Sequence, residues 1–173
     1  EKIMDWISIF NLALGELISP VTATFVLAAL GLSVHFGYTG LLNFGQAAFA
    51  AVGGYGLAIG ILTFDMPLWM ALIFAMFCSA VFALILGIPT LRLRADYLAI
   101  VTIAAAQALR FAFATSAYDE VTGGANGLSQ FGEDFYSYNP IPEGRYPLGA
   151  LEFSEKELWI RIGGWSLVAV AAL

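Results

Sequence analysis

Residues 17 to 64 read LISPVTATFVLAALGLSVHFGYTGLLNFGQAAFAAVGGYGLAIGILTF and contain no Asp, Glu, Lys or Arg. As one straight helix this stretch would be roughly 72 Å long, about twice the thickness of the hydrocarbon core of a bilayer. We therefore expect two membrane-spanning helices, at 18–36 and 41–63. The break between them falls at 37–40, where Gly37 and Gly40 release the backbone.

Further apolar stretches along the chain predict three more helices. Pro67 suits a first helical turn, and Pro89 is expected to end the helix that begins there. Asp96 is a good N-cap for the next helix, because its carboxylate faces the positive end of the helix dipole. The last apolar segment begins near Leu158 and continues to Leu173, so we expect a fifth span that is truncated in this chain. The predicted helices are 67–88, 96–115 and the start of a span at 158–173.

The amino end is predicted to form a short interfacial helix over residues 4–15. It lacks a basic flank followed directly by a small-residue cleavage site, so a cleaved signal peptide is not favoured. Met4 is a candidate native start.

The composition indicates a membrane protein. Hydrophobic residues make up 60% of the chain and charged residues 12%, well away from the averages of soluble proteins. The net charge of −6 excludes a basic nucleic-acid binder. One His and one Cys cannot build the usual zinc site, and Cys78 is interpreted as a small core residue. The expected fold class is an all-α polytopic membrane protein with about five transmembrane helices, a broken or Gly-rich second span and an external acidic loop or cap.

The basic residues set the expected orientation, because short cytoplasmic loops are enriched in Lys and Arg. Arg92 and Arg94 then mark the cytoplasmic side, and the turn at 37–40 lies on that side too. Asp65 and the amino terminus face outside, as does segment 116–157, which carries the whole excess of negative charge. For segment 116–157, which contains several aromatic residues that could pack, a folded cap and a free loop are equally favoured by composition. The predicted domains are a membrane domain at 1–115, the external segment at 116–157 and the start of the fifth span at 158–173.

The second span is unusually rich in glycine and amide side chains. Gly56 and Gly60 form a G-x-x-x-G pair, which lets two helix backbones approach closely. The alternative is a broken or closely packed pore helix, in which Asn43 and Gln46 offer hydrogen bonds to a polar solute. The pattern alone favours packing. The packing candidates are Gly53, Gly56 and Gly60, and the candidates for a substrate path are Asn43, Gly45 and Gln46.

Gln107 and Arg110 lie three residues apart in the fourth span and share a face that must avoid lipid. An intramembrane Arg is a functional candidate by default, so both residues are also candidates for the substrate path. Arg110 could equally extend to the outer interface or pair with an acid elsewhere. His35, near the cytoplasmic end of the first span, is interpreted as an interfacial or hydrogen-bonded histidine rather than a proton relay.

Thr122-Gly123-Gly124-Ala125-Asn126-Gly127 forms a turn cluster after the fourth span. It resembles a phosphate-binding glycine loop only superficially, because it lacks the Lys-Ser/Thr ending and no strand precedes it. The lone His35 and the external acids fall on opposite sides of the membrane in the expected topology, so a Ser/His/Asp set cannot form. Catalysis by this chain therefore has little support.

Three sequence blocks occur in a fixed order between residues 31 and 128. The first runs from 31 to 49 and continues in Gly53-Gly54-Tyr55, the second runs from 91 to 102, and the third from 122 to 128. Together they resemble the amino-terminal half of branched-chain amino-acid ABC transporter permeases of the LivM type. The second block is similar to that family's L-R-x-x-Y-L-A-I-x-T segment and the third to its T-G-G-x-x-G segment. Three blocks in one order are far more specific than any one alone.

The resemblance implies a multi-pass subunit of the bacterial inner membrane that forms the path of an ATP-driven importer for leucine, isoleucine and valine. The implied partners are a second permease subunit, two cytoplasmic ATPase subunits and an external substrate-binding protein. ATP and Mg²⁺ would bind to the ATPase subunits, so this subunit is expected to be no enzyme and to hold no cofactor. A permease for urea or short amides, a passive small-solute channel and a structural bundle are the alternatives. The external motif consists of Thr122, Gly123, Gly124, Asn126 and Gly127.

Overall fold

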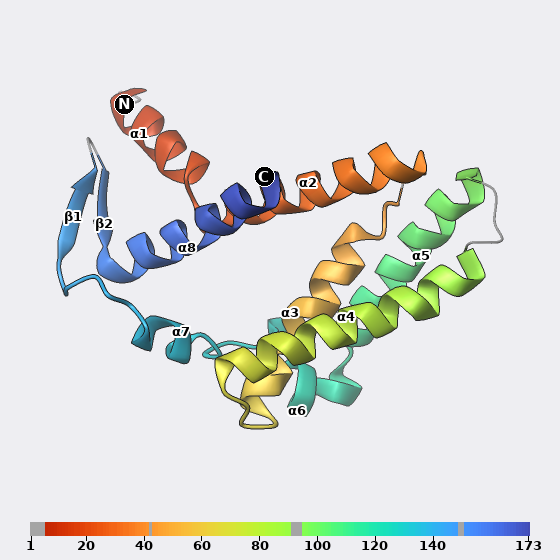
Figure 1. Cartoon of the computed structure of the whole chain (residues 1–173). Coiled ribbons are helices and arrows are strands. Elements are labelled where there is room, and N and C mark those ends of the chain that lie inside the picture. The colour runs from red at the N-terminus through yellow and green to blue at the C-terminus, as the bar shows by residue number, and fades with distance from the viewer. Residues whose placement is uncertain (1–5, 42, 91–94, 149–150) are drawn as a thin grey trace, which may run out of the picture. The chain divides into compact units, whose positions relative to one another are not determined.

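The computed structural model describes residues 6–41, 43–90, 95–148 and 151–173 (Figure 1). The chain divides into two compact units, one of residues 34–135 and one of the residues up to 33 together with 136–173. Most of the described residues are helical, as the sequence predicts. The division into 1–115, 116–157 and 158–173 stays a prediction.

The long helices that lie wholly within the 34–135 unit are α3 (Gln46–Leu62), α4 (Leu68–Thr90) and α5 (Ala95–Ala114). Small residues bring α3 and α4 together as antiparallel neighbours. A Cβ atom added to Gly56 would lie 3.1 Å from the Cα atom of Ala75, and one added to Gly60 would lie 3.2 Å from the Cβ atom of Ala71. Both alanines are buried. The two backbones approach this closely because small residues recur every four positions along the facing sides of both helices.

Helices α3 and α5 run parallel. Just before α3, a Cβ atom added to Gly45 would lie 3.2 Å from the Cβ atom of Thr102 on α5. Further along both helices, the rings of Tyr55 and Phe113 lie with their centroids 4.2 Å apart. The starts of α3 and α5 therefore lie at one end of this unit and their last turns at the other, as expected of the second and fourth spans.

Helix α3 begins at Gln46, five residues later than the predicted start at residue 41. The described residues between Gly40 and Gly45 are not helical. The side-chain oxygen of Asn43 accepts a hydrogen bond of 2.8 Å from the backbone N–H of Gly45, and this side-chain-to-backbone turn competes with helix formation. The prediction was wrong because apolar composition does not reveal that turn.

The ends of α4 and α5 also differ from the prediction. Pro89 does not end α4, because the helix continues to Thr90, whose hydroxyl donates to the carbonyl of Leu86 over 2.8 Å. A proline in the last turn costs little, since few hydrogen bonds remain to be broken there. Helix α5 begins at Ala95, so Asp96 lies in its first turn and is not the N-cap. Arg92 and Arg94, which set the expected orientation, lie outside the described residues.

Four short helical segments follow α5: η1 (Ser116–Tyr118), α6 (Asp119–Thr122), η2 (Gly124–Asn126) and α7 (Glu133–Ser137). They occupy the first half of the segment expected to be an external loop or cap. Residues up to 135 belong to the unit of α3, α4 and α5, and those from 136 onward belong to the other unit. The segment thus contains regular structure along much of its length.

The other unit contains α1 (Trp6–Leu17), the first part of α2 (Pro20–Thr39) and α8 (Glu155–Ala172). Two side chains of α8 hold the end of α1. The Nη1 atom of Arg161 donates to the carbonyl of Gly15 over 2.8 Å, and the Nε1 atom of Trp165 donates to the carbonyl of Ile18 over 3.2 Å. Carbonyls at the end of a helix lack partners within the helix, so these bonds satisfy them.

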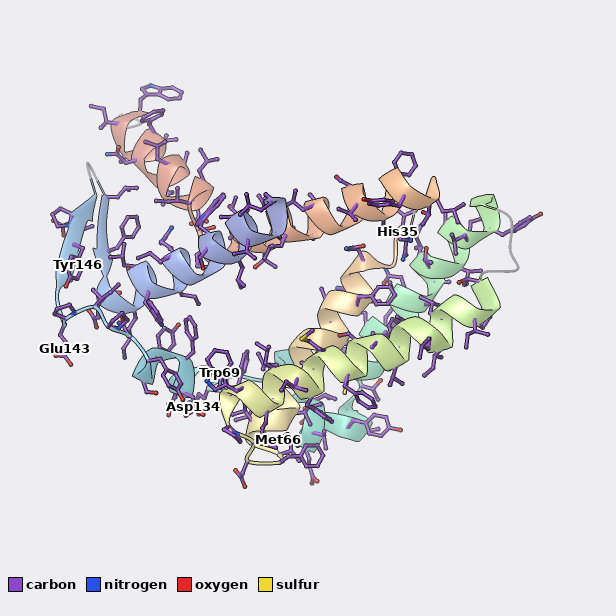
Figure 2. The ribbon with its side chains drawn as sticks, in the orientation of Figure 1. His35, Met66, Trp69, Asp134, Glu143 and Tyr146 are labelled. Carbon is purple, nitrogen blue, oxygen red and sulfur yellow. The ribbon has the colours of Figure 1, made fainter. Side chains whose placement is uncertain are left out.

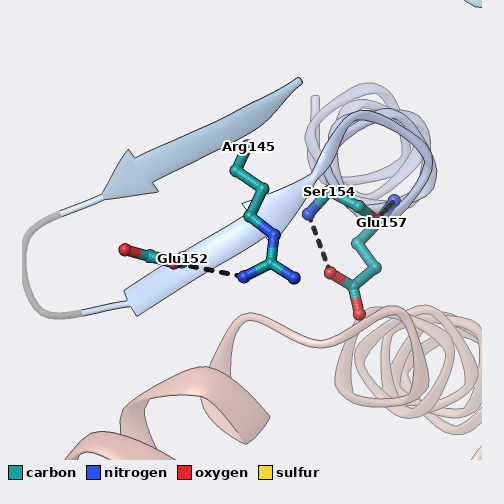
Figure 3. A network of polar contacts seen from close by, with 4 residues as sticks. All are labelled: Arg145, Glu152, Ser154 and Glu157. Atoms are coloured by element: carbon teal, nitrogen blue, oxygen red, sulfur yellow. Dashed lines mark hydrogen bonds and ion pairs between the residues drawn. The ribbon is translucent and has the colours of Figure 1, made fainter. Parts of the chain in front are cut away.

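A two-stranded antiparallel hairpin precedes α8, which the expected all-α fold did not include. Its strands are β1 (Arg145–Leu148) and β2 (Leu151–Ser154), and Tyr146 faces Phe153 across them. Figure 3 shows the ion pair of 3.7 Å between Arg145 and Glu152 on this hairpin. Both side chains of the pair are well exposed, so it contributes little to stability.

Helix α8 begins at a capping box formed by Ser154 and Glu157 (Figure 3). The carboxylate of Glu157 accepts a hydrogen bond of 2.9 Å from the backbone N–H of Ser154, and the Ser154 hydroxyl accepts one of 3.3 Å from the N–H of Glu157. Two N–H groups that a helix start leaves unpaired are thereby satisfied. The backbone hydrogen bond to Ser154 lowers the pKa of Glu157 from its ordinary value of 4.5.

Within the described ranges, three helices are long and apolar enough to cross a membrane. Helix α3 has 17 residues, which corresponds to roughly 26 Å, somewhat less than the roughly 30 Å of a hydrocarbon core. Helix α1, close to the predicted interfacial helix, has Trp6 and Phe10 largely exposed. About five spans were predicted, and the three that meet the length and composition criterion are α2, α4 and the Tyr97–Ala114 part of α5.

Candidate functional site

A polar-lined cavity of the 34–135 unit lies between α3, α5 and the glycine-rich segment after α5. Its volume is about 730 Å³, within the range of sites that bind small molecules. It brings together parts of the second span, the fourth span and the external motif, which are far apart in the sequence. The lining residues are Ala47, Ala48, Ala51 and Tyr55 of α3, Ala106, Gln107, Arg110, Phe113 and Ala114 of α5, and the segment Gly124–Gly127.

Gln107 and Arg110 form the polar wall of this cavity. Both residues line it from one face of α5, as their spacing of three residues predicts. Among the described residues, Arg110 has neither an ion pair nor a hydrogen bond. One alternative for Arg110 is an ion pair with an acidic residue, and no such pair forms with any acid among the described residues. The guanidinium is left with five N–H donors available to a ligand or to solvent.

Alanines and two aromatic rings make the remaining helical walls. Ala47, Ala48 and Ala51 contribute small side chains from α3. Tyr55, about midway along α3, and Phe113, near the end of α5, also line the cavity, with their rings tilted by 36°. Neither aromatic residue was predicted as a site residue, because an aromatic side chain in an apolar helix gives no signal that separates a cavity wall from a lipid-facing surface.

The external motif is a tight turn fastened to the end of α5. The buried Thr122 hydroxyl lies 3.0 Å from the carbonyl oxygen of Phe113 and 2.9 Å from that of Tyr118, and donates to one of them. The same hydroxyl accepts from the N–H of Gly124 over 3.3 Å. Because Phe113 is itself a lining residue, Thr122 fixes the turn relative to the cavity.

Glycine is required at the centre of this turn. Gly123 has φ +68°, and a Cβ atom there would collide with the carbonyl of Gly127. The N–H of Gly127 donates to the carbonyl of Gly123 over 3.1 Å, which closes the turn. Asn126 and Gly127 then face the cavity together with Gly124. The segment thus forms a wall of the cavity, while Thr122 and Gly123 hold it in shape.

A second, smaller cavity of about 350 Å³ lies between the end of α2, the start of α3 and parts of α4 and α5. Asn43, Thr90 and Thr102 supply polar groups to it, together with His35, which Figure 2 labels. The Nδ1 atom of His35 is buried and has no hydrogen-bond partner within the described ranges. The interpretation of His35 as an interfacial or hydrogen-bonded histidine stays a prediction.

The remaining candidates of the second span lie at the start of α3 or on its α4 side. Gly45 is buried against Thr102, and Gln46 is half-buried as the first residue of α3. Neither is among the described residues that line the two cavities. Gly53 faces α4, where an added Cβ atom would lie 3.2 Å from the Ser79 hydroxyl oxygen. Gly53, Gly56 and Gly60 thus all lie along the α4 interface.

Comparison with known proteins identifies the family. The family described as "branched-chain amino acid transport system / permease component" matches residues 16–173. The high-affinity branched-chain amino acid transport system permease protein LivM of Salmonella typhimurium is 37% identical over 148 residues, which cover 86% of this chain and 31% of that protein. LivM of Escherichia coli is 36% identical over 148 residues, with the same coverage. No solved structure shows a significant match.

The chain spans about a third of the length of these curated relatives. The family match, in contrast, extends over nearly the whole chain, from residue 16 to residue 173. It therefore includes the three apolar helices and both cavities. The chain belongs to the family of permease components of branched-chain amino acid transport systems.

Proposed function

We propose that this chain is part of the permease subunit of an ATP-driven importer for branched-chain amino acids, and that the 730 Å³ cavity belongs to its substrate path. One observation carries this proposal: the cavity gathers polar residues of α5, small residues of α3 and the Gly124–Gly127 turn at one place. A path through apolar helices needs such polar groups, because a polar solute loses its hydration inside the membrane.

The dimensions and chemistry of the cavity suit leucine, isoleucine and valine. Its volume lies within the usual range for small-molecule sites. The polar wall of Gln107 and Arg110 can bind charged groups, and the wall of alanines and aromatic rings can accept an aliphatic side chain. The printed names of the two relatives support the same class of substrate.

The proposed assembly contains a second permease subunit, two cytoplasmic ATPase subunits and an external substrate-binding protein. ATP and Mg²⁺ would act on the ATPase subunits, which would drive the change of access. In a bacterial inner membrane the chain would cross several times, with the start of α3 toward the cytoplasm and the external motif toward the binding protein. Asn43, Gly45 and Gln46 would then lie near the cytoplasmic end of the path.

Two other functions make different predictions. A permease for urea or short amides would use the same ATPases with another substrate. A passive channel would need neither an ATPase nor a receptor. The amide side chains Asn43 and Gln107, which line the two cavities, are compatible with either solute.

The test is competitive uptake by the full-length permease, reconstituted in proteoliposomes with its ATPases and binding protein. Radiolabelled leucine and radiolabelled urea are compared with and without ATP. We expect ATP-dependent leucine uptake that isoleucine and valine compete for. ATP-dependent uptake of urea without uptake of leucine would keep the importer and identify urea as the substrate. Flux of either solute without ATP would overturn the proposal of an importer and favour a passive channel.

A further inference from the structure

We propose that Arg110 binds the carboxylate of the transported amino acid, so that the cavity admits carboxylate-bearing solutes in preference to urea and amides. This inference rests on the proposed function, because it assigns a role to one residue of the same cavity. It predicts that selection against uncharged amides occurs in the permease itself.

The first argument is the unpaired charge of Arg110. The residue lies four positions before the end of an apolar helix that is long enough to span a membrane. A guanidinium in such a helix is costly unless water or an anion meets it. Within the described ranges no carboxylate pairs with it, and it lines a cavity large enough for an amino acid.

The second argument is geometric complementarity. A guanidinium donates two parallel N–H···O bonds to the two oxygens of a carboxylate, and both bonds are strengthened by the opposite charges. A neutral amide or urea offers one uncharged oxygen and cannot form this pair. Gln107 lies one turn away on the same wall, and its amide can donate to the carboxylate or accept from the ammonium group of a zwitterion. Two adjacent polar side chains can therefore meet both charges of an amino acid.

The third argument is the contrast between the walls. Ala47 and Ala51 line the cavity from α3 with methyl groups, and the contacting rings of Tyr55 and Phe113 line it as well. A solute held by its carboxylate at Arg110 can extend an aliphatic side chain along this apolar wall. A small polar solute such as urea would leave that wall without a contact, so the cavity fits an amphipathic ligand better.

The test uses the purified full-length permease complex without the soluble receptor, so that the selectivity of the receptor does not enter. Binding of radiolabelled leucine is competed with leucinamide, which lacks the carboxylate, and with 4-methylpentanoate, which keeps it and lacks the amine. We expect 4-methylpentanoate to compete and leucinamide to fail. Arg110→Gln should weaken leucine binding about tenfold or more, the loss expected for a hydrogen-bonded charge pair, while Arg110→Lys should retain part of it.

Arg145→Gln is the matched control. It removes the same charge from an exposed side chain of the hairpin and should leave receptor-free leucine binding unchanged. Assembly with the ATPase subunits and basal ATP hydrolysis are measured for every variant, so that a misfolded protein is recognised. If Arg110→Gln misfolds, the comparison of leucine, leucinamide and 4-methylpentanoate on the wild-type complex decides.

Three results would overturn the proposal: equal competition by leucinamide and leucine, unchanged leucine binding by a folded Arg110→Gln complex, or no leucine binding by a wild-type complex that takes up leucine. The proposed function fails differently. It fails when the complete wild-type system takes up no leucine in an ATP-dependent way, whatever the behaviour of Arg110.

Discussion

The ring of Tyr55 on α3 lies with its centroid 4.2 Å from that of Phe113 on α5, and the two planes are tilted by 36°. The pair joins two helices that are separated in the chain by the whole of α4. Both rings line the 730 Å³ cavity, so the contact that holds α3 beside α5 is also a wall of the candidate site. Stability and cavity shape are therefore coupled at this pair.

Replacing Tyr55 with Leu should lower the free energy of unfolding by about 0.5–1.5 kcal/mol, the value of an aromatic pair beyond its buried area. Tyr55→Phe keeps the ring and should stay near the wild-type value. Equilibrium unfolding of the full-length permease in mixed micelles measures both. Equal losses for the two variants would show that the ring contact does not contribute.

Replacing Gly56 with Leu should separate α3 from α4, because even a Cβ atom would lie 3.1 Å from the backbone of Ala75. The expected loss of stability is about 1–3 kcal/mol, as for other overpacked sites. Gly54→Leu is the control, since a Cβ atom at Gly54 meets nothing within 4 Å. The same unfolding assay compares them, and similar stabilities would contradict close packing at Gly56.

Replacing Gly123 with Ala should distort the turn of the external motif. The residue has φ +68°, which costs an L-residue about 1 kcal/mol, and its Cβ atom would collide with the carbonyl of Gly127. We expect lower stability and lower uptake, because Gly127 lines the cavity. Ser129→Ala, at an exposed position of the following segment, should have little effect. Normal uptake by Gly123→Ala would show that the turn is not needed in this form.

Replacing Asn43 or Gln46 with Leu should impair uptake while the complex still assembles. The two variants should differ in stability. Asn43→Leu leaves the N–H of Gly45 without its 2.8 Å hydrogen bond, which should cost about 1–3 kcal/mol if that group stays buried. Uptake assays and unfolding measurements on both variants test this. Unchanged uptake in both would remove this end of α3 from the proposed path.

The start of α8 should loosen in acid. The hydrogen bond from the N–H of Ser154 lowers the pKa of Glu157 below 4.5, so the folded state favours the ionised carboxylate. The contribution of this hydrogen bond to stability is therefore complete above the pKa that Glu157 has in the unfolded chain. It is lost as the pH falls through the lower pKa that Glu157 has in the folded chain. Hydrogen exchange at the Ser154 amide, corrected for its intrinsic rate, should show protection near neutral pH that falls in strong acid.

Glu157→Gln is the control for this pH dependence. A glutamine keeps an acceptor oxygen at the same position but does not titrate, so protection of the Ser154 amide should no longer change between neutral and strongly acidic pH. If wild-type and variant amides lose protection in parallel, the carboxylate of Glu157 is not the titrating group.

Amino-acid sequence alone determined that the chain belongs in a membrane and where its long helices lie. The run from 17 to 64 without charges must cross a bilayer as helices, because an unpaired backbone in hydrocarbon is too costly. The spacing of Gln107 and Arg110 also showed that they share a face, since residues three apart are neighbours on any helix. The small-residue spacing of Gly56 and Gly60 indicated a close helix contact in the same way.

Only the tertiary structure decided which of these features meet. Nothing in the sequence indicates that Tyr55 faces Phe113 or that Gly124 and Asn126 close a cavity against Arg110, because uniformly apolar helices carry no stripe that selects one neighbour. The hairpin before α8 likewise depends on a particular pairing, that of Tyr146 with Phe153. The later start of α3 is instead a local effect, the hydrogen bond of Asn43 to Gly45, which apolar composition does not reveal. Helix formation in lipid is set by local backbone hydrogen bonding, whereas the site depends on packing between residues that are distant in the chain.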